Sequence, residues 1–356
     1  MGGIRFVHNR FCACFCLKTT GAYSLRPFLF AIMAILTISL PGWAEEAEPG
    51  YHFGLGPFQI RSQSPAHSLR LSLTPTVPGK IMPGHFKARI GGTWSNVWAE
   101  EERYLLDYEM FDTDLALGYG ISPRIFISLG YDRRDYFGGA MDGFIQSFHD
   151  ILNLDQTGRD AVPRNQTRIV FYDEANNVLL DTDDVGRLQN AGISVSAQYI
   201  FYHGTDRWPA VGLSGTLRYG VETPDGGDDG EPIDIGVSLG ISKRWSDRWY
   251  TYFSGGFTYY GQNEYLGLQL NDTILSAMLG LEWRWRPNFS ILFQYLATQG
   301  AAEDFGQLSD PSQEITFGLK WQPTDKGVLE FGIIENIFIH DNSPDFGLHL
   351  AYTHQF

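Results

Sequence analysis

From Phe86 to the end of the chain, large apolar residues alternate with small or polar ones. In the last stretch, Asp345 to Phe356, one set of alternate positions is apolar and consists of Phe346, Leu348, Leu350 and Tyr352. The positions between them are small or polar and consist of Gly347, His349, Ala351 and Thr353. A period of two is that of a β-strand, and these faces suit a strand between lipid and a polar interior. The pattern therefore predicts strands that cross a membrane.

Twelve stretches carry this alternation. They are residues 86–98, 107–120, 125–132, 193–201, 211–219, 233–245, 249–260, 273–285, 289–298, 315–321, 328–340 and 345–356. Every second connection is short and the others are longer or more polar, as in outer-membrane barrels. A secreted β-sandwich would also alternate, but it would not ordinarily keep one strongly apolar face through a dozen strands. We therefore predict an all-β fold: a transmembrane antiparallel up-and-down β-barrel of about 12 strands in the outer membrane of a Gram-negative cell.

Residues 45–85 precede the regular pattern and are rich in proline, which a central sheet does not accept. We interpret them as a periplasmic segment, or as a plug folded back into the barrel mouth. Alternatively, residues 58–62 and 67–73 add a hairpin, which makes 14 strands possible.

Residues 137–188 interrupt the pattern and predict a large extracellular insertion. Apolar residues recur at helical spacing between residues 138 and 153, which indicates an amphipathic helix. Residues 166–172 and 178–183 then predict a hairpin turned by DEANN.

The single long apolar run, Pro27 to Ala44, follows Arg26 and precedes Glu45. A basic start, an apolar stretch of this length and small residues at its end predict a signal peptide over residues 1–44. All three cysteines lie in this leader, so no disulfide is expected after cleavage. The leader holds four basic and no acidic residues, so its removal would change the formal net charge from −15 to −19, which disfavours nucleic acid as a partner.

The positions predicted to face the barrel interior include both acidic and basic residues. Among them are Arg89, Asp112, Asp114, Arg218, Asp234, Glu282, Arg284, Glu314 and His349. A ring of one sign would indicate ion selectivity. A mixed set instead predicts a salt-bridged network that braces the interior, or a weakly selective pore for small solutes, and no metal site or cofactor is predicted.

Catalytic candidates are poor. Gly236 to Gly240 matches G-x-S-x-G, but it lies within a strand, where that motif does not act. Ser147 and His149 lie in the predicted helix, and His349 lies in the last strand. Near neighbours on a helix do not face each other, so no catalytic residue is assigned. A porin-like channel or uptake protein for small solutes is the leading hypothesis, and a lipid-modifying enzyme or an adhesive barrel presenting residues 137–188 are the alternatives.

Two resemblances add to this picture. The terminal Phe356 resembles the ending of outer-membrane barrels, which implies outer-membrane lipids and the barrel-assembly machinery as partners. Residues 138–160, GGAMDGFIQSFHDILNLDQTGRD, together with residues 118–132 and 57–65, resemble an uncharacterised proteobacterial family, domain of unknown function 3187. The resemblance implies an envelope protein and transfers no catalytic or binding residue.

Overall fold

The computed structural model describes residues 53–139, 141, 143, 167–173, 175–182, 189–222, 232–265, 268–337 and 341–356. The predicted leader and most of the predicted helix between residues 138 and 153 lie outside the described residues. Within the described part, no helix is long and apolar enough to cross a membrane.

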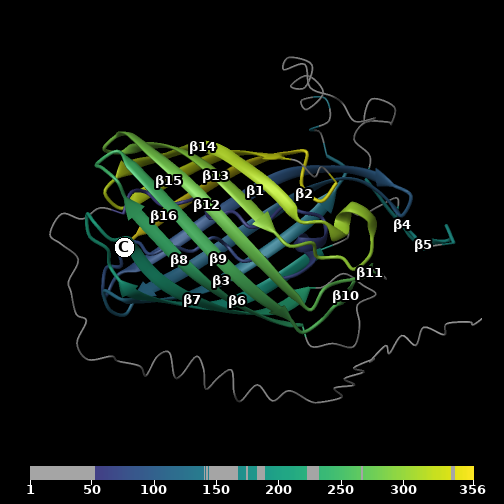
Figure 1. The fold of residues 1–356 in the computed structure, drawn as a ribbon, viewed down its shortest axis with the longest axis horizontal. Coiled ribbons are helices and arrows are strands. Elements are labelled where there is room, and N and C mark those ends of the chain that lie inside the picture. The colour runs from purple at the N-terminus through teal and green to yellow at the C-terminus, as the bar shows by residue number, and fades with distance from the viewer. Residues whose placement is uncertain are drawn as a thin grey trace, which may run out of the picture. The chain divides into compact units, whose positions relative to one another are not determined.

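Twelve strands of the described chain form a closed antiparallel barrel (Figure 1). They are β1 (Phe86–Glu101), β2 (Tyr104–Gly120), β3 (Ile125–Phe137), β6 (Gln189–Tyr202), β7 (Ala210–Glu222), β8 (Ile233–Arg244), β9 (Trp249–Tyr260), β12 (Thr273–Arg286), β13 (Phe289–Thr298), β14 (Ser312–Thr324), β15 (Gly327–Asn336) and β16 (Phe346–Gln355). Each pairs with its neighbours, and β16 pairs with β1 to close the ring. A closed ring satisfies the backbone hydrogen bonds of every strand, as a lipid environment requires. The predicted barrel is confirmed.

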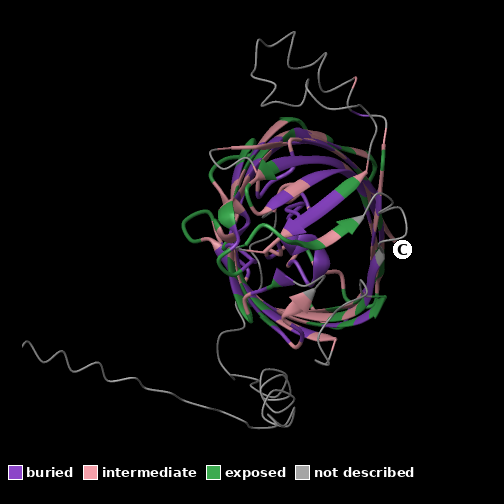
Figure 2. Ribbon diagram, turned by 90° about the vertical axis from the view of Figure 1, so that its right-hand side faces the viewer, coloured by how far each residue is buried: buried purple, intermediate pink, exposed green. Residues whose placement is uncertain are grey.

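The two faces of the barrel differ as the alternation predicts. Outward side chains are apolar and exposed, such as Ile90 at 57% and Leu350 at 62%. Their inward neighbours Arg89 and His349 are 7% and 2% exposed. Figure 2 shows exposed and buried positions alternating along the strands around the ring. The interior of the barrel is therefore polar and densely occupied.

The two ends of the barrel differ in their connections. One end, here the turn end, carries the turns at residues 121–124, 203–209, 245–248, 287–288 and 325–326. The chain terminus lies there too, because the backbone N–H of Phe356 donates to the carbonyl of Phe86 over 2.9 Å. The opposite end, the loop end, carries the longer connections and the tight turn between β1 and β2.

Four further strands lie near the loop end. β4 (Arg168–Tyr172) pairs with Tyr104–Asp107 of β2, and β5 (Val178–Thr182) pairs with β4. This pair is the hairpin predicted in the insertion, and Figure 1 shows it extending beyond the barrel. The short strands β10 (Glu264–Tyr265) and β11 (Leu268–Gln269) and the 3₁₀ helix η4 (Gly306–Ser309) belong to other connections.

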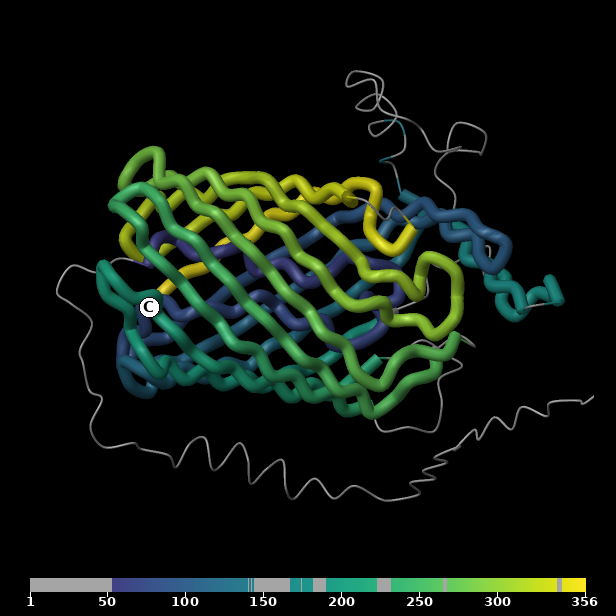
Figure 3. Tube along the Cα trace, in the orientation of Figure 1, coloured from purple at the N-terminus to yellow at the C-terminus, as the bar shows by residue number. Residues whose placement is uncertain are grey.

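Residues 53–85, the N-terminal segment, run through the barrel interior, where Figure 3 shows the first part of the tube enclosed by the strands. Their regular structure is the 3₁₀ helix η1 (Ala66–Leu69), and these described residues form no β-strand. The alternative hairpin over residues 58–62 and 67–73 is therefore wrong. Inward side chains of the barrel, such as Glu282 and Glu314, accept hydrogen bonds from this backbone in place of a neighbouring strand.

The N-terminal segment makes one loop with both ends at the turn end. Its rising arm, residues 55–64, runs from Glu282 near the turn end to Ser312 at the loop end. η1 forms the apex, and the returning arm, residues 71–82, leads back to Gly120 beside a turn. At the apex, Leu69 and Leu71 belong to the buried cluster that also contains Tyr104 and Phe305. This apolar cluster occupies the loop end of the interior.

Candidate functional site: the barrel interior

The rising arm begins on a buried carboxylate. The backbone N–H of Leu55 donates to both oxygens of Glu282 over 3.1 and 3.0 Å, and Ser290 and Tyr252 donate their hydroxyls to the same group. Lys320 donates its ammonium to the carbonyl of Pro57 over 2.7 Å. Charged side chains thus hold an irregular backbone that has no strand partner.

The loop-end part of the rising arm is held by a second buried carboxylate. The backbone N–H of Gln63 donates to both oxygens of Glu314 over 3.0 and 3.1 Å. The hydroxyl of Ser62 donates to Glu314 as well and lies 3.4 Å from the hydroxyl of Ser312. Ser62, Gln63 and Glu314 are all at most 2% exposed. The carboxylate therefore has its hydrogen bonds satisfied by the segment itself.

A buried ion-pair network joins the segment to the barrel. Arg61 of the rising arm pairs with Asp112 and, at 3.1 Å, with Asp132. Arg218 pairs with Asp132 at 2.8 Å, and Arg134 lies 3.4 Å from Asp112. The basic residues of the segment and wall thus compensate the buried carboxylates, as such groups require.

A second network lies across β1, β15 and β16. Glu330 pairs with Arg89 at 2.8 Å and with Lys320 at 3.2 Å. His349 lies 3.8 Å from Glu330 through Nε2, and its Nδ1 is 2.8 Å from the hydroxyl of Thr93. Although Thr93, His349 and Glu330 resemble a catalytic set, all three are at most 4% exposed and none lines the main cavity. The arrangement braces the interior and offers no substrate access.

The apex is held by hydrogen bonds and by an aromatic ring. Asp234 accepts from the N–H of Leu71 over 2.9 Å, and Tyr260 donates to the carbonyl of the same residue over 2.9 Å. The guanidinium of Arg70 lies 3.6 Å from the centre of the Tyr260 ring. Burial, followed by the charge of Arg70 and Arg134, lowers the pKa of the apex residue His67 to about 3. The apex thus holds a neutral imidazole among cations.

Glycines allow the returning arm to lie against β8. A Cβ at Gly236 would be 2.5 Å from Leu73, and one at Gly240 would be 2.3 Å from the carbonyl oxygen of Thr76. Neither distance is compatible with a side chain in this conformation, so these two glycines allow the close approach of the arm to β8. Ser242 of the same strand donates its hydroxyl to the carbonyl of Pro78 over 3.1 Å.

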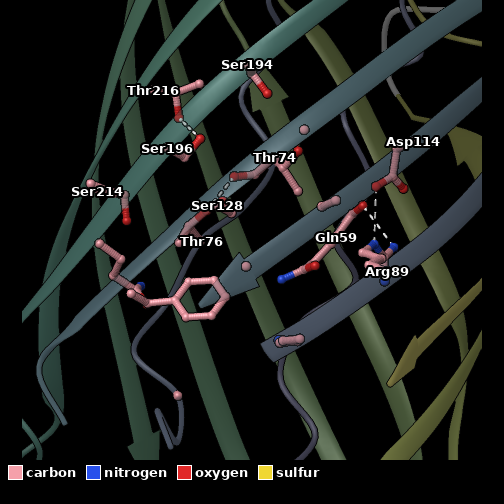
Figure 4. A pocket seen from close by; sticks show the side chains of 18 of the residues that line it. Gln59, Thr74, Thr76, Arg89, Asp114, Ser128, Ser194, Ser196, Ser214 and Thr216 are labelled. Atoms are coloured by element: carbon pink, nitrogen blue, oxygen red, sulfur yellow. Dashed lines mark hydrogen bonds and ion pairs between the residues drawn. The ribbon is translucent and has the colours of Figure 1, made fainter. Parts of the chain in front are cut away.

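A cavity of about 260 Å³ remains between the N-terminal segment and the wall formed by β1, β2, β3, β6, β7 and β8. Figure 4 shows Thr74 and Thr76 of the returning arm facing the hydroxyls of the wall. The wall contributes Ser128, Ser194, Ser196, Ser214, Thr216 and Ser238. The lining includes Met82, His85 and Gln355, so the cavity extends towards the turn end.

The structure places the predicted inward residues in three settings. Seven belong to the contacts and networks above or border them, namely Arg89, Asp112, Asp114, Arg218, Asp234, Glu282 and Glu314. Arg284 lies at the turn end and donates to the carbonyl of Pro287 over 2.8 Å, apart from the networks. His349 lies inside beside Glu330 and Thr93. Ser147 and His149 fall outside the described residues.

Sequence reasoning assigned no role to Arg61, Ser62, Gln63 and Arg70, although all four are buried in the N-terminal segment. Two arginines in a stretch without acids were the available signal, because such cations need carboxylates from elsewhere. The hydroxyl wall was also missed, because its members alternate with glycine and carry no charge.

The chain is similar to several solved structures of outer-membrane proteins. The crystal structure of the COG4313 outer membrane channel from Pseudomonas putida F1 matches with a TM-score of 0.50 and 14% identity, over 79% of this chain and 100% of that chain. The NanC porin matches with a TM-score of 0.44 and 9% identity, over 76% of this chain and 98% of its own. The CymD monoaromatic hydrocarbon channel matches with a TM-score of 0.40 and 11% identity, over 85% and 99%. The first likeness shows a shared barrel fold.

A search of curated proteins finds no match to this chain. The sequence does match the family described as protein of unknown function (DUF3187), over residues 33–356. This span includes the N-terminal segment and all twelve barrel strands, and it confirms the resemblance seen in the sequence. The chain belongs to the DUF3187 family.

Proposed function

We propose that the protein is an outer-membrane channel for small solutes, and that the N-terminal segment closes it as a plug in the conformation described. The apolar outer face supports a membrane location, because exposed Leu, Ile, Val and Phe side chains would be costly in water. The closed ring and polar inner face support a solute path.

The observation that carries the proposal is the way the segment is bound. The rising arm is held by side chains of the wall, such as Glu282 and Glu314, while the returning arm lies on glycines without a strand partner. A barrel needing only a filled core could use large inward side chains instead. A separate, loop-shaped insert can leave the interior without unpairing any strand, since residues 53–82 form no strand pair with the wall.

A reversible disulfide between the N-terminal segment and the barrel wall tests whether the segment acts as a plug. The hydroxyls of Ser62 and Ser312 lie 3.4 Å apart, so the double variant Ser62→Cys, Ser312→Cys places two thiols at a suitable separation. All native cysteines lie within residues 1–16, upstream of the predicted cleavage site. In planar bilayers, we expect solute-conducting openings in the reduced protein and none in the oxidised protein.

The two single variants, Ser62→Cys and Ser312→Cys, are the controls and should ignore the oxidant. Equal conductance in both redox states would show that the segment is not a plug. Absence of conductance even after deletion of residues 53–82 would contradict the channel itself.

A further inference from the structure

The hydroxyls of the cavity wall form an ordered array across neighbouring strands. Ser128 of β3 pairs in register with Ser196 of β6, and Ser196 pairs with Thr216 of β7. In the next row, Ser214 of β7 pairs with Ser238 of β8. Paired inward positions lie about 5 Å apart, and rows are about 7 Å apart. The wall therefore presents a grid of hydroxyls, and the distances between neighbouring hydroxyls are short enough for one small molecule to contact several of them.

Most of these hydroxyls have no partner in the described protein. Ser196 and Thr216 are hydrogen-bonded to each other over 2.9 Å. Within the described part of the chain, the hydroxyls of Ser128, Ser194, Ser214 and Ser238 make no hydrogen bond. Each can donate one hydrogen bond and accept two, so the wall offers both kinds of site to a bound molecule.

Charge does not select the ligand at this wall. Asp132 lies between Arg61 and Arg218, at 3.1 and 2.8 Å, and Asp114 is 3.4 Å from Arg89. Lys80 and Lys87 also line the cavity, and both are exposed. Lys87 lies in the same row as Ser128, with Gly118 between them. The charges deep in the cavity are thus compensated, and the array itself is neutral.

The returning arm makes the cavity partly apolar. Leu73 and Val77 of the arm contribute to its lining, although Leu73 lies against Gly236 and Val77 packs against the cluster that contains Met278. Figure 4 shows Thr74 and Thr76 of the same arm. Gln198 on the wall donates to the carbonyl of Val77 over 3.1 Å, which fixes this part of the arm. A molecule with many hydroxyls and a C–H surface fits both parts of this lining, because hydroxyls meet hydroxyls while C–H groups meet the leucine and valine.

We propose that this cavity is a binding site for a small neutral polyhydroxylated solute, no larger than a monosaccharide or a six-carbon sugar alcohol. The proposal rests on the proposed channel function and names the solute class. A volume of about 260 Å³ is slightly smaller than typical ligand pockets, which span about 300–1,000 Å³, so the cavity cannot enclose a larger sugar while the segment is in place.

Binding is measured on the full-length protein in detergent, by equilibrium dialysis with radiolabelled sorbitol. The test variant is Ser214→Ala, Ser238→Ala, which removes two unpartnered hydroxyls. Each lost hydrogen bond weakens binding by about two- to tenfold, so we expect a loss of about four- to hundredfold for the pair. The matched control is Ser276→Ala, an inward serine of β12 that does not line this cavity.

Two competitors define the class. 1,6-Hexanediol has the six-carbon chain with only its two terminal hydroxyls, and gluconate has several hydroxyls together with a negative charge. We expect sorbitol to bind at least tenfold more tightly than either. Equal binding of hexanediol, tighter binding of gluconate, or no loss in the double variant would each overturn the proposal. The assay measures binding and not flux. A negative result would therefore overturn the binding site without deciding whether the protein is a channel, which the conductance experiment tests separately.

Discussion

At the residue scale, the fit between the returning arm and the barrel depends on two missing side chains. Gly236 and Gly240 lie where a Cβ would collide with Leu73 and Thr76. The obstacle at Gly240 is a backbone oxygen, which cannot rotate away as a flexible side chain can. A single methyl group at Gly240 must therefore displace the arm, while the strand itself can accept it.

For the variant Gly240→Ala, we expect a folded barrel with a displaced arm and a higher open probability in planar bilayers. Trypsin cleavage at Arg61 and Arg70 should become faster, because both sites are buried in the native protein. The control is Gly215→Ala, where a Cβ would meet no atom within 4 Å. Unchanged cleavage and conductance for Gly240→Ala would contradict the close approach described here.

Buried and exposed ion pairs should differ strongly in their effect on stability. Arg89→Met removes the partner of Glu330 and leaves a carboxylate that is 3% exposed, although Lys320 remains nearby. We expect the free energy of unfolding to fall by about 3–5 kcal/mol in urea titrations in detergent. Arg168→Met breaks an exposed pair with Asp181 and should cost about 0–1 kcal/mol. Similar losses in both variants would argue against the buried network.

At the element scale, the N-terminal segment is one loop whose apex carries a buried histidine. The lowered pKa of His67 means that protonation favours the released segment over the inserted one. The contribution of this group to retention is complete above its ordinary pKa of 6.5 and decreases as the pH falls below that value towards 3.

Between pH 7.5 and pH 5, we expect retention of the apex to weaken by roughly 2 kcal/mol, at about 1.4 kcal/mol per pH unit below 6.5. Hydrogen exchange of residues 60–72, corrected for the intrinsic rate at each pH, measures the change. His67→Gln cannot titrate at this position, so the contribution of His67 is the difference in pH dependence between the native protein and this variant. The same pH dependence in that variant would assign the effect to other groups.

The strands could be predicted from the sequence and the course of the N-terminal segment could not. Each barrel strand, and the hairpin around DEANN, shows a period of two in its apolar residues and is bounded by turn residues. The segment has no period, because its backbone is held by distant side chains such as Glu282 and Glu314 instead of by a neighbour. The hydroxyl array depends on the register between strands, so Ser196, Ser214 and Ser238 gain meaning only when their partners are known.

At the scale of the whole molecule, the even number of strands places the start of β1 and the end of β16 at the same end of the barrel. β1 and β16 pair from Lys87 with Gln355 to Asn96 with Phe346. This seam is what closes the ring. Phe356 lies just beyond it, and its side chain is 60% exposed, so it contributes little to the folded barrel.

A role of Phe356 in assembly can therefore be tested separately from a role in the stability of the folded barrel. For Phe356→Ala, we expect the free energy of unfolding, measured after refolding in detergent, to change by no more than about 0.5 kcal/mol. In cells, we expect less of the variant in the outer-membrane fraction, because the terminal aromatic resembles the signal that assembly machinery reads. Equal amounts of both proteins in that fraction would contradict this role.

The N-terminal segment enters and leaves the barrel at the same end, and this affects how it responds to a pulling force. A tension applied to the chain ahead of residue 53, from the turn end, loads the bonds at Glu282 first and those at Glu314 only after the first have broken. Bonds that break one after another yield to a far smaller force than bonds loaded together. The same tether, anchored in β1 at its other end, can then return the loop to the interior once the load is released.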